Sequence, residues 1–140
     1  NLKKRSSKPD LISKVLFVNA IPYDQMMQYT LNSDIGVSLD KPNNLNYLYS
    51  LPNKIFDYAK AEIPFVATNL VEIKKVVEEF NTGVLIDSLS PNVLLEGLEK
   101  ALKLKKSKSF NKDVVKMNIL LNWENESLRL LKTYHSFKNI

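Results

Sequence analysis

A proline, an asparagine and a lysine stand together in this chain, and their order suits a ligand that carries phosphate. Pro52 directly precedes Asn53 and Lys54. Proline is favourable at the first turn of a helix, because its missing N–H would have no partner there. The free N–H groups of a first turn attract phosphate, and so does a nearby ammonium group. The stretch predicts a phosphate site at a helix start, although a surface helix with a solvated lysine fits the same spacing.

Alternating apolar strands and amphipathic helices surround this stretch. Strands are predicted at 15–18, 35–39, 65–68 and 84–86, and helices at 24–32 with Asp24 as its cap, 53–60, 71–80 and 91–104. Such alternation with short connections predicts an α/β fold, a Rossmann-like parallel sheet with helices on both faces. The connection 40–51 is long, and long loops at the carboxyl ends of strands are where such folds bind ligands.

Composition limits the classes of protein to which the chain could belong. It has 140 residues, of which 44% are hydrophobic, enough for one domain with a core. It has no cysteine, which excludes a disulfide framework and favours an intracellular address. The formal charge is +5, and the lysine-rich runs 1–14 and 100–112 lack interleaved aromatic residues. We therefore expect solvated surfaces there and no nucleic-acid partner.

The order of the motifs resembles one known family. Residues 50–58 read SLPNKIFDY and residues 63–69 read IPFVATN. Together they resemble the donor-binding C-terminal domain of GT-B glycosyltransferases, in particular the retaining family-four (group 1) enzymes. Residues 15–23, 26–38 and 72–87 resemble the neighbouring segments of that domain in the same order. The resemblance implies the C-terminal half of a GT-B fold, without its first strands and without the acceptor domain.

The resemblance also implies roles for single residues. Lys54 corresponds to a lysine that faces the donor diphosphate, where it would offset charge on the departing nucleotide. Asp57 stands at the second position of the family's pair of acids, which reaches the ribose, while Tyr49 replaces the first acid and departs from the pattern. Asn19 and Ile21 lie in the turn that approaches the nucleobase. The predicted nucleotide-sugar site comprises Asn19, Ile21, Tyr49, Ser50, Pro52, Asn53, Lys54 and Asp57, with Lys54 as the catalytic candidate.

Further expectations concern the backbone of Glu62 and Asn19 and the positions of Trp123 and His135. Glu62 and Asn19 stand where the family has glycine. A left-handed conformation at Glu62 would cost on the order of 1 kcal/mol, whereas asparagine tolerates that conformation better. Trp123 is expected to anchor the last helix to the core, and His135 to lie on a surface or in packing rather than in a site. No acidic cluster has the spacing of a metal site.

The predicted organisation is a single partial nucleotide-sugar-binding domain over 1–140, with 111–140 as a helical tail packed on it. The implied function is transfer of a sugar, with retention, from a UDP-sugar rather than a GDP-sugar to a saccharide or lipid-linked acceptor. No metal or other cofactor is expected, and the implied location is the cytoplasm with peripheral contact at the inner membrane face. A sugar-nucleotide epimerase and a truncated, non-catalytic interaction module are the alternatives. An unpaired sheet edge would favour self-association.

Overall fold

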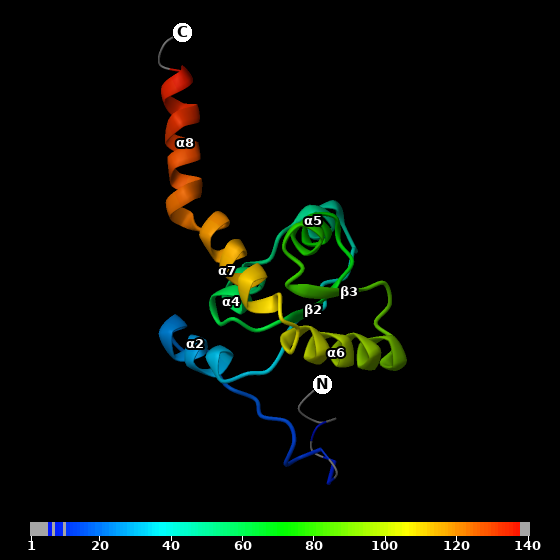
Figure 1. The fold of residues 1–140 in the computed structure, drawn as a ribbon. Coiled ribbons are helices and arrows are strands. Elements are labelled where there is room, and N and C mark those ends of the chain that lie inside the picture. Colours follow the sequence, from blue (N-terminus) through cyan, green and yellow to red (C-terminus); the bar gives the residue numbers. More distant parts are fainter. Residues whose placement is uncertain (1–5, 7, 10, 138–140) are drawn as a thin grey trace.

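Three parallel strands form the centre of the protein. The computed structural model describes residues 6, 8, 9 and 11–137 (Figure 1). Strands β1 (Gly36–Ser38), β2 (Phe65–Thr68) and β3 (Gly83–Ile86) lie in the order β1-β2-β3, with Val37 opposite Val66 and Ala67 opposite Leu85. All four residues of β2 are buried, as is usual for a parallel strand covered on both faces.

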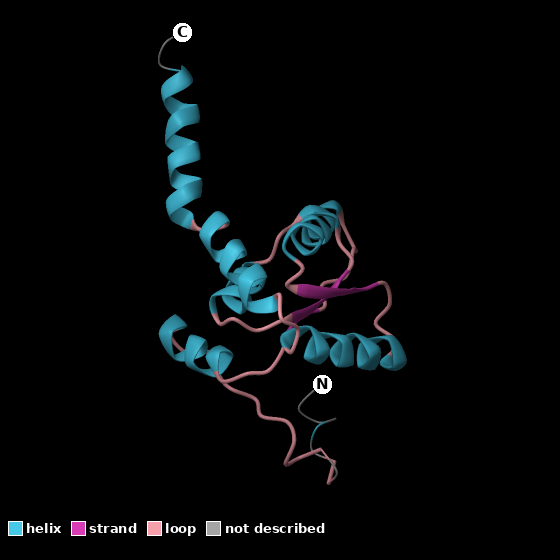
Figure 2. Cartoon of the chain, in the orientation of Figure 1, coloured by secondary structure: helices cyan, strands magenta, loops and turns pink. Residues whose placement is uncertain are grey.

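Helices cover both faces of this sheet (Figure 2). Phe65 and Ala67 point to one face, where they pack with α4 (Asn53–Lys60), α5 (Val71–Phe80) and α7 (Phe110–Leu120). Val66 points to the other face and packs with Ala101 of α6 (Pro91–Lys105). The alternation follows from the two-residue period of a strand. The α/β class and the Rossmann-like parallel sheet predicted from the sequence are confirmed.

Helix α2 (Tyr23–Leu31) packs at one end of α4, where Met27 joins Ala61 and Ile63 in a small buried cluster. The helix begins after Pro22, and Asp24 lies in its first turn. The prediction that Asp24 caps this helix was therefore wrong, because Pro22 is the N-cap residue. An acid inside the first turn still interacts favourably with the helix dipole.

The segment 15–18 is not a strand, contrary to the prediction. Its side chains are 42% to 77% exposed, and the segment lies apart from the sheet in Figure 1. An apolar run of four residues forms a strand only where a neighbouring strand supplies hydrogen-bond partners. The loop 40–51 also differs from the prediction, because it contains the short helix α3 (Leu45–Tyr49). The Asn44 side chain caps α3 by accepting a hydrogen bond from the Tyr47 N–H at 2.9 Å.

Gly83 is required by close packing rather than by a turn. It is the first residue of β3, and a Cβ there would lie 2.4 Å from the Phe65 ring. The turn before β3 is made instead by Asn81, whose φ of 51° is left-handed. Glu62 is also left-handed, with φ of 54°, at the position where the family that the sequence resembles has glycine.

The C-terminal part consists of α7 and α8 (Trp123–Phe137). Helix α7 buries Phe110, Val114 and Met117, whereas α8 buries no side chain and projects away from the sheet (Figure 1). Trp123 is 71% exposed, so it does not anchor α8 in the core as predicted. The Asn122 side chain accepts a hydrogen bond from the Asn125 N–H at 2.8 Å where α8 begins. No helix among the described residues is both long and apolar enough to cross a membrane.

Replacing Glu62 by glycine should stabilise the protein. Glycine adopts the left-handed conformation without a Cβ penalty, and we expect the free energy of unfolding to rise by about 0.5–1 kcal/mol. The matched control is Glu99→Gly, which also removes one exposed carboxylate but lies inside α6. That change should lower the free energy of unfolding by about 1 kcal/mol. Urea denaturation of both variants measures the difference, and a destabilised Glu62→Gly protein would contradict the strain argument.

Candidate functional site

The start of α4 is an open helix end at the carboxyl edge of the sheet. Because β1 and β2 are parallel and α4 lies between them in the chain, α4 runs back across the sheet from that edge. Pro52 is the N-cap residue, just before the first turn in which the sequence placed it, and its carbonyl accepts a hydrogen bond from the Ile55 N–H at 3.0 Å. The proline side chain has no hydrogen-bond acceptor, so Pro52 cannot cap the N–H groups of Asn53 and Lys54.

Lys54 lies beside this helix end and is exposed. It forms no ion pair or hydrogen bond with any side chain in the part of the chain that the structure describes. Its ammonium group is therefore available to an anion from outside the chain. An open helix end together with a nearby cation is an arrangement suited to phosphate.

Asp57 follows one turn later and is held by a residue that the sequence analysis missed. The Tyr23 hydroxyl donates a hydrogen bond to Asp57 Oδ1 at 2.8 Å, and Lys60 Nζ lies 5.6 Å from the centre of the Tyr23 ring. The hydrogen bond to Asp57 is the main cause that raises the pKa of Tyr23 above its ordinary value of 10.0, followed by burial and by the charges of Asp57 and Asp24. Tyr23 thus remains a neutral donor that orients the carboxylate, while Oδ2 accepts no hydrogen bond from a described residue.

The outer face of α4 borders two neighbouring cavities. Asn53 and Asp57 lie four residues apart and share this face, opposite the buried Ile55 and Ala59. Asp57 borders a cavity of about 590 Å³ that is lined by Tyr23, Phe56, Asp57, Lys60, Asn118, Leu121, Asn122, Trp123 and Glu124. Asn53 borders one of about 460 Å³ that is lined by Leu51, Asn53, Phe56, Leu121, Asn122, Trp123 and Glu126. The predicted site thus opens toward the junction of α7 and α8.

The remaining predicted residues lie in two other places. Asn19 and Ile21 border a hollow of about 360 Å³, and the backbone of Asn19 is not left-handed. Tyr49 is exposed at the end of α3, and Ser50 Oγ donates a hydrogen bond to the Tyr47 carbonyl at 3.2 Å. Tyr23 connects the hollow at Asn19 and Ile21 to α4, because it follows Ile21 by two residues and its hydroxyl donates a hydrogen bond to Asp57.

Polar side chains also follow the other strands at the carboxyl edge. The buried Ser38 hydroxyl donates a hydrogen bond to Asp40 Oδ2 at 3.0 Å, and Asn69 Nδ2 donates one to Asp87 Oδ1 at 2.7 Å. Thr68, at the end of β2, is only 8% exposed, and its hydroxyl has no hydrogen-bond partner among the described residues. A buried polar atom without a partner costs stability, so this hydroxyl is a candidate ligand contact. The signal for these residues in the sequence was a polar residue directly at the end of each strand.

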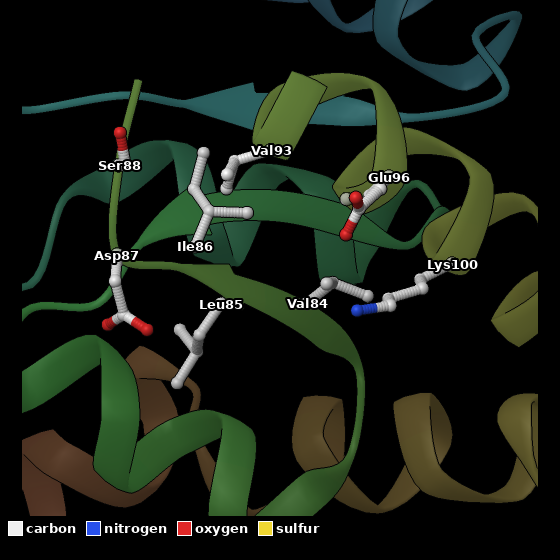
Figure 3. Close-up of a pocket in the computed structure, with 9 residues that line it drawn as sticks. Val84, Leu85, Ile86, Asp87, Ser88, Val93, Glu96 and Lys100 are labelled. Carbon is white, nitrogen blue, oxygen red and sulfur yellow. The ribbon is translucent and has the colours of Figure 1, made fainter. Parts of the chain in front are cut away.

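A smaller cavity of about 210 Å³ lies between β3 and α6 (Figure 3). Glu96 and Lys100 extend toward it from successive turns of α6, and Asp87 directly follows the last residue of β3. Among the residues that the structure describes, no group of three or more histidine, cysteine, aspartate or glutamate side chains is placed to hold a metal ion.

Comparison with solved structures identifies a protein of similar fold. Sucrose-phosphate synthase from Thermosynechococcus elongatus matches with a TM-score of 0.74 and 18% sequence identity, over 99% of this chain and 34% of that chain. The chain therefore spans about a third of the length of that enzyme. No protein-family model and no curated protein matches the sequence. At this identity the structural likeness shows a shared Rossmann-like fold and does not identify a family.

Replacing Asp57 by asparagine should lower the pKa of Tyr23 toward its ordinary value of 10.0, because it removes the charged acceptor. A raised folded-state pKa means that Tyr23 stabilises the fold below pH 10 and loses that contribution as the pH rises through the folded pKa. Asp24→Asn is the matched control, since Asp24 is the smallest of the causes and its loss should shift the pKa less. NMR titration of the Tyr23 ring carbon measures both shifts. Equal shifts in the two variants would contradict the assigned hydrogen bond.

Thr68→Val should raise the free energy of unfolding by about 1 kcal/mol, because it removes a buried hydroxyl that has no hydrogen-bond partner in the described part of the chain. Ser38→Ala is the comparison, since the Ser38 hydroxyl is buried but bonded to Asp40, and its loss should lower the free energy of unfolding by about 1 kcal/mol. Thermal and urea denaturation provide the values. If both variants are destabilised equally, the Thr68 hydroxyl is not unsatisfied in the free protein.

Proposed function

We propose that this chain is the donor-binding part of a glycosyltransferase and that the start of α4 receives the diphosphate of a nucleotide-sugar. The observation that carries the proposal is the open helix end at Asn53, with Asp57 one turn further on and with Lys54 beside it, which pairs with no side chain of the described residues. Diphosphate is the ligand group that uses both features, because the helix end and the ammonium group stabilise its negative charge.

Each side chain then has a distinct role. Lys54 offsets the charge that develops on the nucleoside diphosphate as the sugar leaves, which makes it the catalytic candidate. Asp57 accepts hydrogen bonds from the ribose hydroxyls through the oxygen that Tyr23 does not occupy. Asn19 and Ile21 border the nucleobase, while Tyr49, Ser50 and Asn53 form the polar rim of the nucleotide-sugar site. The free hydroxyl of Thr68 faces the sugar.

The structural likeness supports this proposal at the level of the fold. Sucrose-phosphate synthase is named for forming sucrose phosphate, and this chain corresponds to about a third of it. We infer transfer with retention, a UDP-sugar rather than a GDP-sugar, and a saccharide or lipid-linked acceptor, which another part of the enzyme would bind. This chain would bind the donor without transferring the sugar. We place it in the cytoplasm, with peripheral contact at the inner membrane face, and we expect no metal at the diphosphate.

An epimerase of the same architecture is less well supported. Such an enzyme needs acid–base groups around the sugar. The single histidine, His135, lies on α8, which buries no side chain and projects away from the sheet. A non-catalytic interaction module differs from a donor-binding domain in one measurable property, because it would not bind the nucleotide.

Calorimetric titration of the chain with UDP and with GDP tests the proposal. We expect saturable binding that is stronger for UDP, and a loss of affinity of ten- to a hundredfold in Lys54→Ala and in Asp57→Asn, because each removes a charged partner of the ligand. Lys100→Ala is the matched control, since this exposed lysine borders the separate cavity at α6 and its loss should leave affinity unchanged. If a folded chain binds neither nucleotide, or if all three variants bind equally well, the proposed donor site is wrong.

A further inference from the structure

Trp123 is the one tryptophan of the chain, and its side chain lies outside the core beside the candidate site. It is 71% exposed, and α8, which begins at this residue, buries no side chain. Trp123 nevertheless borders both cavities on the outer face of α4, the one at Asn53 and the one at Asp57. A large aromatic side chain that is not used in the core and that lines two cavities is placed to contact a ligand.

Hydrogen bonds of the preceding asparagine, rather than packing of the indole ring, fix the place of Trp123. Asn122 Nδ2 donates to the carbonyls of Asn118 and Ile119 at 3.0 Å each, at the end of α7. Asn122 Oδ1 accepts a hydrogen bond from the Asn125 N–H at 2.8 Å, in the first turn of α8. Figure 1 shows α8 starting where α7 ends. The indole is therefore held beside the two cavities, although the junction of the helices does not need it.

We propose that Trp123 is a ligand-contacting residue of the donor site and packs against the nucleoside of the bound nucleotide-sugar. This inference rests on the proposed function, which places the diphosphate at the start of α4 and the ribose at Asp57. Trp123 and Asp57 line the same cavity of about 590 Å³. A nucleoside that Asp57 binds therefore occupies the cavity that the indole borders.

The polar groups of this cavity favour the nucleoside over the phosphates. Asp57 and Glu124 place two carboxylates at the cavity, against one ammonium group from Lys60. Carboxylates repel phosphate, but they accept hydrogen bonds from hydroxyl and base N–H groups. Asn118 Nδ2 donates to the Ala59 carbonyl at 2.9 Å, and its Oδ1 accepts no hydrogen bond from a described residue. The cavity thus offers acceptors, and a nucleoside supplies the matching donors.

Two more aromatic rings line the same space. Phe56 borders both cavities, and Tyr23, which is 50% exposed, borders the one at Asp57. Flat apolar walls with a few polar groups are typical of pockets for small organic ligands. Stacking on an aromatic side chain tolerates every base, because every base has a π-face. We therefore expect Trp123 to add affinity for a nucleotide without choosing between uracil and guanine.

A protein surface is the competing partner for an exposed tryptophan. Such a partner would cover the apolar indole, but it would make no use of the carboxylates and the amide oxygen in the cavity. The nucleoside is favoured because it uses the indole of Trp123 together with Asp57 and Asn118. The two partners also differ in a measurable property, since only the nucleotide would change the surroundings of Trp123 when nothing else is added to the chain.

Tryptophan fluorescence tests the contact directly, because the emission of this chain comes from Trp123 alone. We expect UDP to shift the emission to shorter wavelength and to slow acrylamide quenching about twofold, since the indole loses contact with water. Pyrophosphate should leave the emission unchanged, because it lacks the nucleoside. If UDP binds in calorimetry without changing emission or quenching, or if pyrophosphate causes the same change, Trp123 does not contact the nucleoside and the donor site stands without it.

Substitution provides the second test. Trp123→Ala should weaken the binding of UDP and of GDP by the same factor, about tenfold, because stacking on the nucleoside is lost. Trp123→Phe should keep most of the affinity. Phe137→Ala is the matched control, since this aromatic residue of α8 is 68% exposed and lines neither cavity, and its loss should leave affinity unchanged.

Urea denaturation of Trp123→Ala separates ligand contact from a structural role. The free energy of unfolding should equal that of the unmodified chain, because the side chain is exposed. Unchanged nucleotide affinity in Trp123→Ala, or an equal loss in Phe137→Ala, would overturn the inference about Trp123 alone. Failure of the unmodified, folded chain to bind either nucleotide would overturn the donor site, and the inference with it.

Discussion

The burial of β2 on both of its faces is the constraint on which the rest of the structure depends. Phe65 and Ala67 require α4, α5 and α7 on one side, and Val66 requires α6 on the other. Because the strands are parallel, each connecting helix must return to the opposite end of the sheet before the next strand begins. The start of α4 therefore lies at the carboxyl edge, together with Ser38, Thr68 and Asp87. The polar groups of the candidate site meet there as a result of packing in the core.

The elements that the sequence predicted well are those in which a local pattern and a buried environment agree. Strand β2 and helices α4 and α5 have the predicted bounds, because their apolar residues recur with the period of the element and most of them pack in the core. The run 15–18 and Trp123 are equally apolar, yet both are exposed. The hydrophobicity of a residue alone does not predict whether a neighbouring element lies close enough to bury its side chain.

The candidate site shows the same division between local and distant information. The helix start at Pro52 and the lysine beside it are local features, and both could be predicted from a few neighbouring residues. The hydrogen bond between Tyr23 and Asp57 joins residues 34 positions apart, and the sequence contained no signal for it. The free hydroxyl of Thr68 could not be predicted either, because its lack of a partner depends on every group that packs around the end of β2.

The hydrogen bond between Tyr23 and Asp57 also links the orientation of the Asp57 side chain to the position of helix α2. Helix α2 has one buried residue, Met27, so few contacts besides this bond fix its position against α4. A ligand that changes the orientation of Asp57 also changes the constraint on α2 and on the preceding segment, which contains Asn19 and Ile21. If a ligand at Asp57 changes the affinity of this segment for a second group, that group must change the affinity at Asp57 by the same factor. A single exposed hydrogen bond thus joins α4 to the segment that contains Asn19 and Ile21.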